Sequence, residues 1–143
     1  MLRIVGMLGV ALATLMSVGQ ASADTLDGAY RGTIVCEKMK NSQFMLQAPF
    51  DVTVSGKSVI AARPIFNLKG TRVVASEIAT GTLADDGTVR LVSNWKGAGS
   101  SFQGNYGGAL TDKGAALTGT QAWTTADGAQ TRACTVAIIQ AKS

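Results

Sequence analysis

The side chains that most often carry out acid–base catalysis and metal binding are scarce in this chain. It contains no histidine and only two cysteines, so neither a Ser–His nor a Cys–His nucleophile pair can form, and a metal site with several His or Cys ligands is excluded. No Gly-x-Ser-x-Gly motif occurs either. The composition therefore predicts a protein that is not an enzyme and that has no catalytic residues, metal ion or cofactor.

The acidic residues do not indicate a catalytic pair. Two carboxylates can cleave a glycosidic bond when the fold brings them to either side of it, but the spacing of Glu37, Asp51 and Glu77 does not show that any two of them converge. Four other aspartates stand in turn-like stretches, where aspartate usually has a structural role: Asp85, Asp86, Asp112 and Asp127.

One stretch of the chain carries positive charge without acidic residues to balance it. Between Asp51 and Glu77 there are four basic residues and no acidic one, namely Lys57, Arg63, Lys69 and Arg72. If the segment 64–70 lies at one rim of the fold, Arg63, Lys69 and Arg72 form a basic collar. Such a collar would attract an anionic small molecule or an acidic polymer of the cell envelope. A solvated surface, with charges that only favour solubility, is the alternative.

Three large aromatic residues form a second candidate set. Trp95, Tyr106 and Trp123 each fall on the alternating face that carries the apolar residues of their segment. Aromatic rings in concave sites stack on ligands, so these three could line a partly open interior; packing in a filled core is the alternative. The candidate ligand-binding residues are therefore Trp95, Tyr106, Trp123, Arg63 and Arg72.

The first 23 residues have the pattern of an export signal. Arg3 precedes an apolar run from Ile4 to Val18, and Ala21-Ser22-Ala23 follows; this order is typical of a signal peptide and its cleavage site. A membrane anchor is the alternative, but about 15 apolar residues are fewer than the roughly 20 that span a bilayer as a helix. We expect cleavage before Asp24, no membrane span afterwards, and a periplasmic or secreted protein.

The two cysteines agree with an oxidising compartment. Cys36 and Cys134 lie near opposite ends of the single domain expected over 24–143, and disulfides persist in exported proteins. A redox function would require a Cys-x-x-Cys motif or an activating environment, and Arg132 is the one basic residue close to Cys134 in the sequence. We expect a structural disulfide.

The rest of the chain alternates as β-strands do. Thr, Val and Gly recur, glycine interrupts helical patterns, and apolar and polar residues alternate with a period of two. Short turns rich in Gly and Asp join most of the runs, which cover 30–36, 50–55, 58–63, 72–83, 88–95, 102–110, 117–123 and 130–140. We predict an all-β domain, a single eight-stranded antiparallel up-and-down barrel, with a two-sheet β-sandwich as the alternative. A disulfide between the first and last strands favours the barrel because it joins the two sheet edges.

The opening of the first strand carries a family resemblance. Gly28-Ala29-Tyr30, followed by a meander with short turns, resembles the calycin group of lipocalins and avidins, whose first strand usually opens Gly-x-Trp. Tyr30 stands where that group usually has tryptophan. The resemblance implies a barrel with a ligand cavity. Small exported inhibitors of bacterial proteases also share such barrels and a single disulfide.

Two functions follow. The first is an exported binding protein that holds a small apolar or anionic ligand in its barrel. The second is a module that docks on, or inhibits, another envelope protein through a terminal segment or through segments 37–47 and 64–70. An open interior would favour the binding protein, and a filled interior would favour the docking module. In the first case Phe44, Met45 and Phe66 would border the mouth of the ligand cavity, and in the second they would plug the end of the barrel. The charges, a formal net +4, are too dispersed to indicate nucleic-acid binding, and we expect a monomer.

Overall fold

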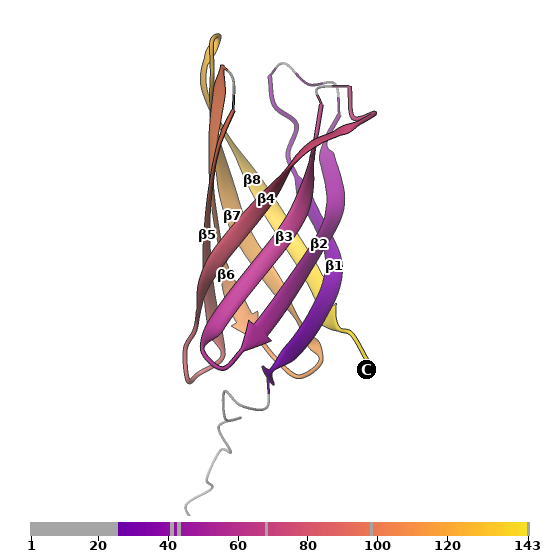
Figure 1. Cartoon of the computed structure of the whole chain (residues 1–143), viewed down its shortest axis with the longest axis vertical. Coiled ribbons are helices and arrows are strands. Elements are labelled where there is room, and N and C mark those ends of the chain that lie inside the picture. The colour runs from indigo at the N-terminus through magenta and orange to yellow at the C-terminus, as the bar shows by residue number, and fades with distance from the viewer. Residues whose placement is uncertain (1–25, 41, 43, 68, 98, 143) are drawn as a thin grey trace, which may run out of the picture.

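Eight antiparallel strands form a closed barrel in which each strand pairs with its neighbours in the chain and β1 pairs with β8 (Figure 1). The structure, a computed structural model, describes residues 26–142 except 41, 43, 68 and 98, so the expected signal peptide over 1–23 lies outside the described residues. The strands are β1 (Gly28–Cys36), β2 (Leu46–Ser55), β3 (Ser58–Phe66), β4 (Val73–Leu83), β5 (Thr88–Gly97), β6 (Ser100–Leu110), β7 (Gly114–Thr125) and β8 (Gly128–Gln140). The predicted up-and-down barrel is confirmed, and the sandwich is not formed.

The period-two pattern of the sequence becomes the two faces of the barrel wall. In β2, Ala48, Phe50, Val52 and Val54 are buried and the residues between them are exposed, as expected when successive side chains point to opposite faces of a strand. The turn between β4 and β5 depends on Gly87, whose φ of 85° lies in the left-handed region that favours glycine. Local alternation and turn chemistry therefore explain most of the strand boundaries.

The lower half of the barrel, as drawn in Figure 1, is filled by a continuous apolar core. Inward-facing side chains such as Ile34, Phe50 and Leu91 have no more than about one-hundredth of their surface exposed. At the lower end Tyr30 is fully buried, and its hydroxyl donates a hydrogen bond to the carbonyl oxygen of Leu26 at 2.8 Å. The interior of this half is therefore apolar and closed to solvent.

The upper half has a looser wall. The ladder between β4 and β5 extends only from Leu83↔Val89 to Ala79↔Ser93, and the two strands diverge above that point (Figure 1). By contrast, β6 pairs with β7 from Leu110↔Ala115 up to Ser100↔Thr125. The barrel therefore widens toward the end at which β1 and β3 finish.

A disulfide joins the first and last strands. Cys36 and Cys134 are bonded, face each other in the β1–β8 ladder, and are buried. The predicted pairing is confirmed, and the disulfide joins β1 to β8 at the last pair of their ladder.

Among the described residues, no helix has the length and apolar character needed to cross a membrane.

We expect the disulfide to contribute strongly to stability because it restricts the unfolded chain over a separation of 98 residues. The Cys36→Ser/Cys134→Ser variant should lose about 2 to 5 kcal/mol in free energy of unfolding, measured by urea denaturation. Reduction of the unaltered protein should give a matching loss. Equal unfolding midpoints with and without reductant would contradict the expectation.

Candidate functional site

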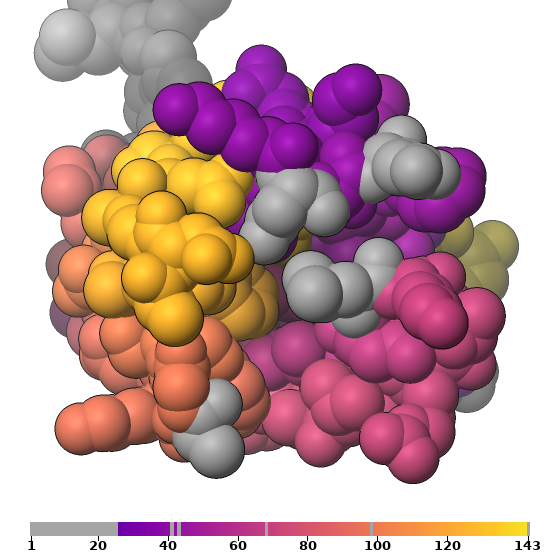
Figure 2. Space-filling model, turned by 90° about the horizontal axis from the view of Figure 1, so that it is seen from above, coloured from indigo at the N-terminus to yellow at the C-terminus, as the bar shows by residue number. Residues whose placement is uncertain are grey.

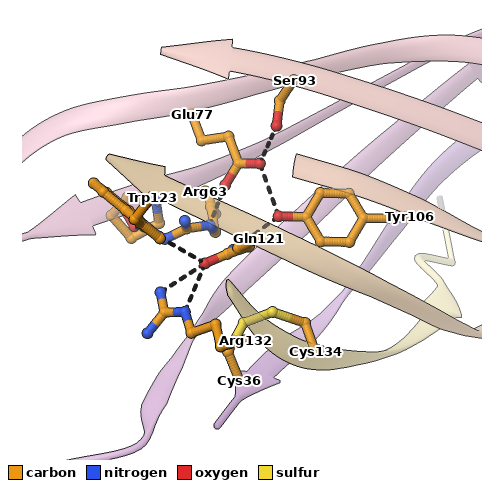
Figure 3. A network of polar contacts seen from close by, with 10 residues as sticks. Cys36, Arg63, Glu77, Ser93, Tyr106, Gln121, Trp123, Arg132 and Cys134 are labelled. Atoms are coloured by element: carbon orange, nitrogen blue, oxygen red, sulfur yellow. Dashed lines mark hydrogen bonds and ion pairs between the residues drawn. A yellow bond between two sulfur atoms is a disulfide. The ribbon is translucent and has the colours of Figure 1, made fainter. Parts of the chain in front are cut away.

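A layer of buried polar side chains crosses the barrel between its filled and open halves (Figure 3). Each member comes from a different strand among β3 to β8, and none has more than 7% of its surface exposed. We call this group the polar layer; it consists of Arg63, Glu77, Ser93, Tyr106, Gln121 and Arg132.

Glu77 accepts most of the hydrogen bonds on the β3–β6 side of the polar layer. Its Oε2 forms an ion pair with Nε of Arg63, and its Oε1 accepts hydrogen bonds from Ser93 Oγ and from the Tyr106 hydroxyl, the latter at 2.8 Å. A buried carboxylate is stable only when its oxygens are bonded in this way. Glu77 thus connects β4 to β3, β5 and β6.

Gln121 extends the layer to the opposite wall. Its Nε2 donates to the Tyr106 hydroxyl at 2.8 Å, and its Oε1 accepts from Nε and Nη2 of Arg132 at 2.9 and 2.6 Å. The indole Nε1 of Trp123 also lies 3.4 Å from the same oxygen. The amide is therefore used at both ends, which fixes its orientation.

Two pKa shifts in the layer follow from burial. Desolvation, with the negative charge of Glu77 next, raises the pKa of Tyr106 well above its usual value, so the phenol stays neutral and keeps its donor proton. Desolvation, followed by the positive charge of Arg63, lowers the pKa of Arg132 to about 10. Arg132 is therefore still charged at neutral pH.

The positions of these residues follow from strand register. Ser93, Gly104, Gln121 and Arg132 are successive partners across β5 to β8, and Arg63 faces Glu77 across β3 and β4. A Cβ at Gly104 would lie 2.5 Å from Ser93 Oγ and 2.9 Å from Glu77 Oε1. Glycine at this position leaves the space in which the carboxylate and its donors meet.

Above the polar layer lies a cavity of about 780 Å³ that opens at the upper end. Seen from above, the β1–β2, β3–β4, β5–β6 and β7–β8 connections surround this end, and the surface is hollowed between them (Figure 2). Arg63 and Arg132 contribute cations from the polar layer to the lining. Most of the other lining residues are apolar, including Leu46, Ile65, Phe66, Val74, Trp95 and Trp123. The volume and lining are typical of a small-molecule site.

The aromatic rings form a cluster beside the arginines. The Trp123 ring centroid lies 6.0 Å from that of Trp95 and 4.8 Å from that of Phe102. The guanidinium carbon of Arg63 lies 5.6 Å from the centroid of Phe102, a cation–π distance. Trp95 and Trp123 are only partly buried, so their rings contribute to the cavity wall and are not enclosed in the core.

The structure separates the predicted ligand-binding residues into three groups. Arg63, Trp95 and Trp123 line the cavity together. Tyr106 lies within the polar layer and is outside the cavity lining. Arg72 is exposed at the connection between β3 and β4, and it too is outside the lining.

The rim segments named from the sequence do reach this cavity. Phe44, Met45 and Phe66 are part of its lining, as is Lys69. Phe44 and Met45 are 66% and 60% exposed, so they border the mouth and do not plug it.

Four members of the polar layer were missing from the predicted site: Glu77, Ser93, Gln121 and Arg132. The sequence does indicate that these residues face inward, because each lies an even number of positions from the buried apolar residues of its strand. A charged or amide residue on an inward face of a barrel strand needs polar partners. Taking the inward polar residues of neighbouring strands together would have indicated the layer.

Comparison of the chain with family models, with curated proteins and with solved structures found no match. Within the part of the chain that the structure describes, no three Cys, Asp or Glu side chains gather as a metal site would require. The geometry itself is therefore the basis for assigning a function.

We expect the polar layer to depend on Glu77. Glu77→Gln keeps the shape of the side chain but leaves two buried arginines without a carboxylate, and it should lower the free energy of unfolding by about 3 to 5 kcal/mol, measured by urea denaturation. The matched variant Glu77→Gln/Arg63→Met removes both charges of the ion pair and should recover about half of that loss or more. A loss below about 1 kcal/mol in Glu77→Gln would show that the ion pair contributes no more than an exposed one.

Proposed function

We propose that this protein is an exported binding protein that holds a small apolar or anionic ligand in the upper half of its barrel. The proposal concerns binding without a catalytic step. The kinship with the calycin group suggested by Gly28-Ala29-Tyr30 is part of the same proposal, because that group also carries ligands inside eight-stranded barrels.

The observation that carries the proposal is the division of the barrel interior. The lower half is an apolar core of buried side chains, as in the interior of an ordinary domain. The upper half keeps a cavity of about 780 Å³ with aromatic walls and a cationic floor, within the roughly 300 to 1,000 Å³ typical of ligand sites. A barrel with a purely structural role would gain stability by filling this space.

Export is supported by two features of different kinds. The order of basic, apolar and small residues over 1–23 is that of a cleavable signal peptide. The disulfide between Cys36 and Cys134 is a bond that persists in oxidising compartments such as the periplasm or the extracellular space. We therefore place the protein outside the reducing cytosol.

A second candidate function is docking on, or inhibition of, another envelope protein such as a protease. The observation that favours it is the exposure of Phe44 and Met45 on the connection between β1 and β2. Exposed apolar residues on a loop are common in protein contacts. If the protein binds a ligand, the same residues form part of the cavity mouth, because they also belong to its lining.

A ligand in the cavity should change the emission of Trp95 and Trp123. We expect 1-anilinonaphthalene-8-sulfonate, which is both aromatic and anionic, to quench tryptophan fluorescence saturably. Trp123→Ala should weaken this binding by about 1 kcal/mol or more, whereas the control Ile139→Ala, on the outer face and 70% exposed, should leave it unchanged. Absence of saturable quenching would remove the ligand-binding function and leave docking as the leading candidate.

The mature protein should begin at Asp24. Mass spectrometry of the intact chain, purified from the periplasm or the medium of the cells that make it, should give the mass of residues 24–143 with one disulfide. A chain that retains 4–18 in most molecules would contradict cleavage and indicate an uncleaved anchor.

A further inference from the structure

The charges of the polar layer do not balance. The layer contains two guanidinium groups, those of Arg63 and Arg132, and one carboxylate, that of Glu77. Among the described residues, the only ion pair inside the barrel is that between Arg63 and Glu77. One positive charge is therefore left over beneath the cavity.

The surplus charge comes with free hydrogen-bonding capacity. Nη2 of Arg63 is buried and has no hydrogen-bond partner among the described residues. Among the described residues, Arg132 donates only to the neutral amide oxygen of Gln121. Its pKa is lowered by desolvation and by the charge of Arg63. This state is costly, since among the described residues no carboxylate forms an ion pair with Arg132 and no acceptor meets Nη2 of Arg63.

We propose that the cavity binds an amphipathic organic monoanion whose carboxylate, or an equally compact anionic group, is held by Arg63 and Arg132. This proposal rests on the ligand-binding function proposed above and names the chemical class of its ligand. One negative charge on the ligand balances the two guanidinium groups and the one carboxylate of the polar layer. A second negative charge at the same end of the ligand would have no cation to pair with and would be repelled by Glu77. The unpartnered Nη2 of Arg63 can donate to such an anion, and hydrogen bonds between two charged groups are stronger than those between neutral ones.

The body of the ligand is apolar and points toward the mouth. Exposure of the lining residues rises along the cavity, from 3% and 7% for Arg63 and Arg132 to 66% for Phe44. Between these two levels the lining includes Phe66, Trp95 and Trp123. The charged end of the ligand therefore lies deepest, and its apolar part covers the aromatic walls and reaches the exposed residues at the rim.

The test compares decanoate with decanol, which have the same chain length and differ in charge. Binding is measured by tryptophan fluorescence and by calorimetry at pH 7.5. We expect decanoate to bind at least about tenfold more tightly than decanol, the difference that a charge-assisted hydrogen bond gives. Sebacate, which carries a second carboxylate at the other end, should bind less tightly than decanoate because that carboxylate would lose part of its hydration against Phe44 and Met45 at the rim.

Variants locate the charged end. Arg132→Gln should weaken decanoate binding at least about tenfold and change decanol binding less than about twofold. The control Lys69→Gln removes a positive charge from the cavity rim and should change decanoate binding less than about threefold, since exposed charges interact weakly. The comparison of decanoate with decanol in the unaltered protein decides the question even if Arg132→Gln fails to fold.

The outcomes distinguish the assignment of a monoanionic ligand from the ligand-binding function on which it rests. Decanol that binds as tightly as decanoate would overturn the monoanion assignment and leave a binding protein for neutral apolar ligands. A loss in Lys69→Gln equal to that in Arg132→Gln would place the anion at the rim and also overturn the assignment. Absence of saturable binding by decanoate, decanol and 1-anilinonaphthalene-8-sulfonate would overturn the ligand-binding function itself.

Discussion

The upper half of the barrel depends on one buried carboxylate. The backbone ladder between β4 and β5 ends at Ala79↔Ser93, and Glu77 lies just beyond it on β4. Its bonds to Ser93 on β5 and to Tyr106 on β6 replace the missing backbone contacts with side-chain contacts, while its ion pair with Arg63 ties β4 to β3. The wall can therefore open without separating, because charged hydrogen bonds hold the strands together at the level where the ladder stops.

This arrangement gives the two halves of one small domain different interiors. Below the polar layer the interior is an apolar core, and burial of apolar surface is the dominant favourable contribution to folding. Above the layer the same wall encloses a cavity, with the disulfide of Cys36 and Cys134 closing the barrel seam nearby. The surplus positive charge beneath the cavity lowers the stability of the empty protein, because a buried charge without a counter-ion is unfavourable.

The sequence was sufficient for the parts of the structure that depend on local rules. Alternation placed the strands, Asp and Gly residues placed turns such as that at Gly87, and the positions of Cys36 and Cys134 in the first and last strands indicated closure. Arg63, Trp95 and Trp123 do line the cavity, but the basic collar expected at the rim is not formed, because Arg63 is buried in the polar layer and Arg72 lies outside the lining. The meeting of the three lining residues with Glu77 and Arg132 could not be predicted in the same way, because it depends on the register between strands distant in the sequence. The point at which β4 leaves β5 likewise has no local signal, and without it the open half could not be distinguished from a filled one.

If the upper half of the barrel binds one small organic anion, native mass spectrometry of the protein purified from the cells that make it should detect that anion. We expect a fraction of the folded protein to carry a single small molecule, released on unfolding and detected as a monoanionic acid with an apolar skeleton. Protein without any bound molecule, or a released molecule that is neutral, would show that the cavity does not bind such an anion, and a second polypeptide in place of a small molecule would favour docking.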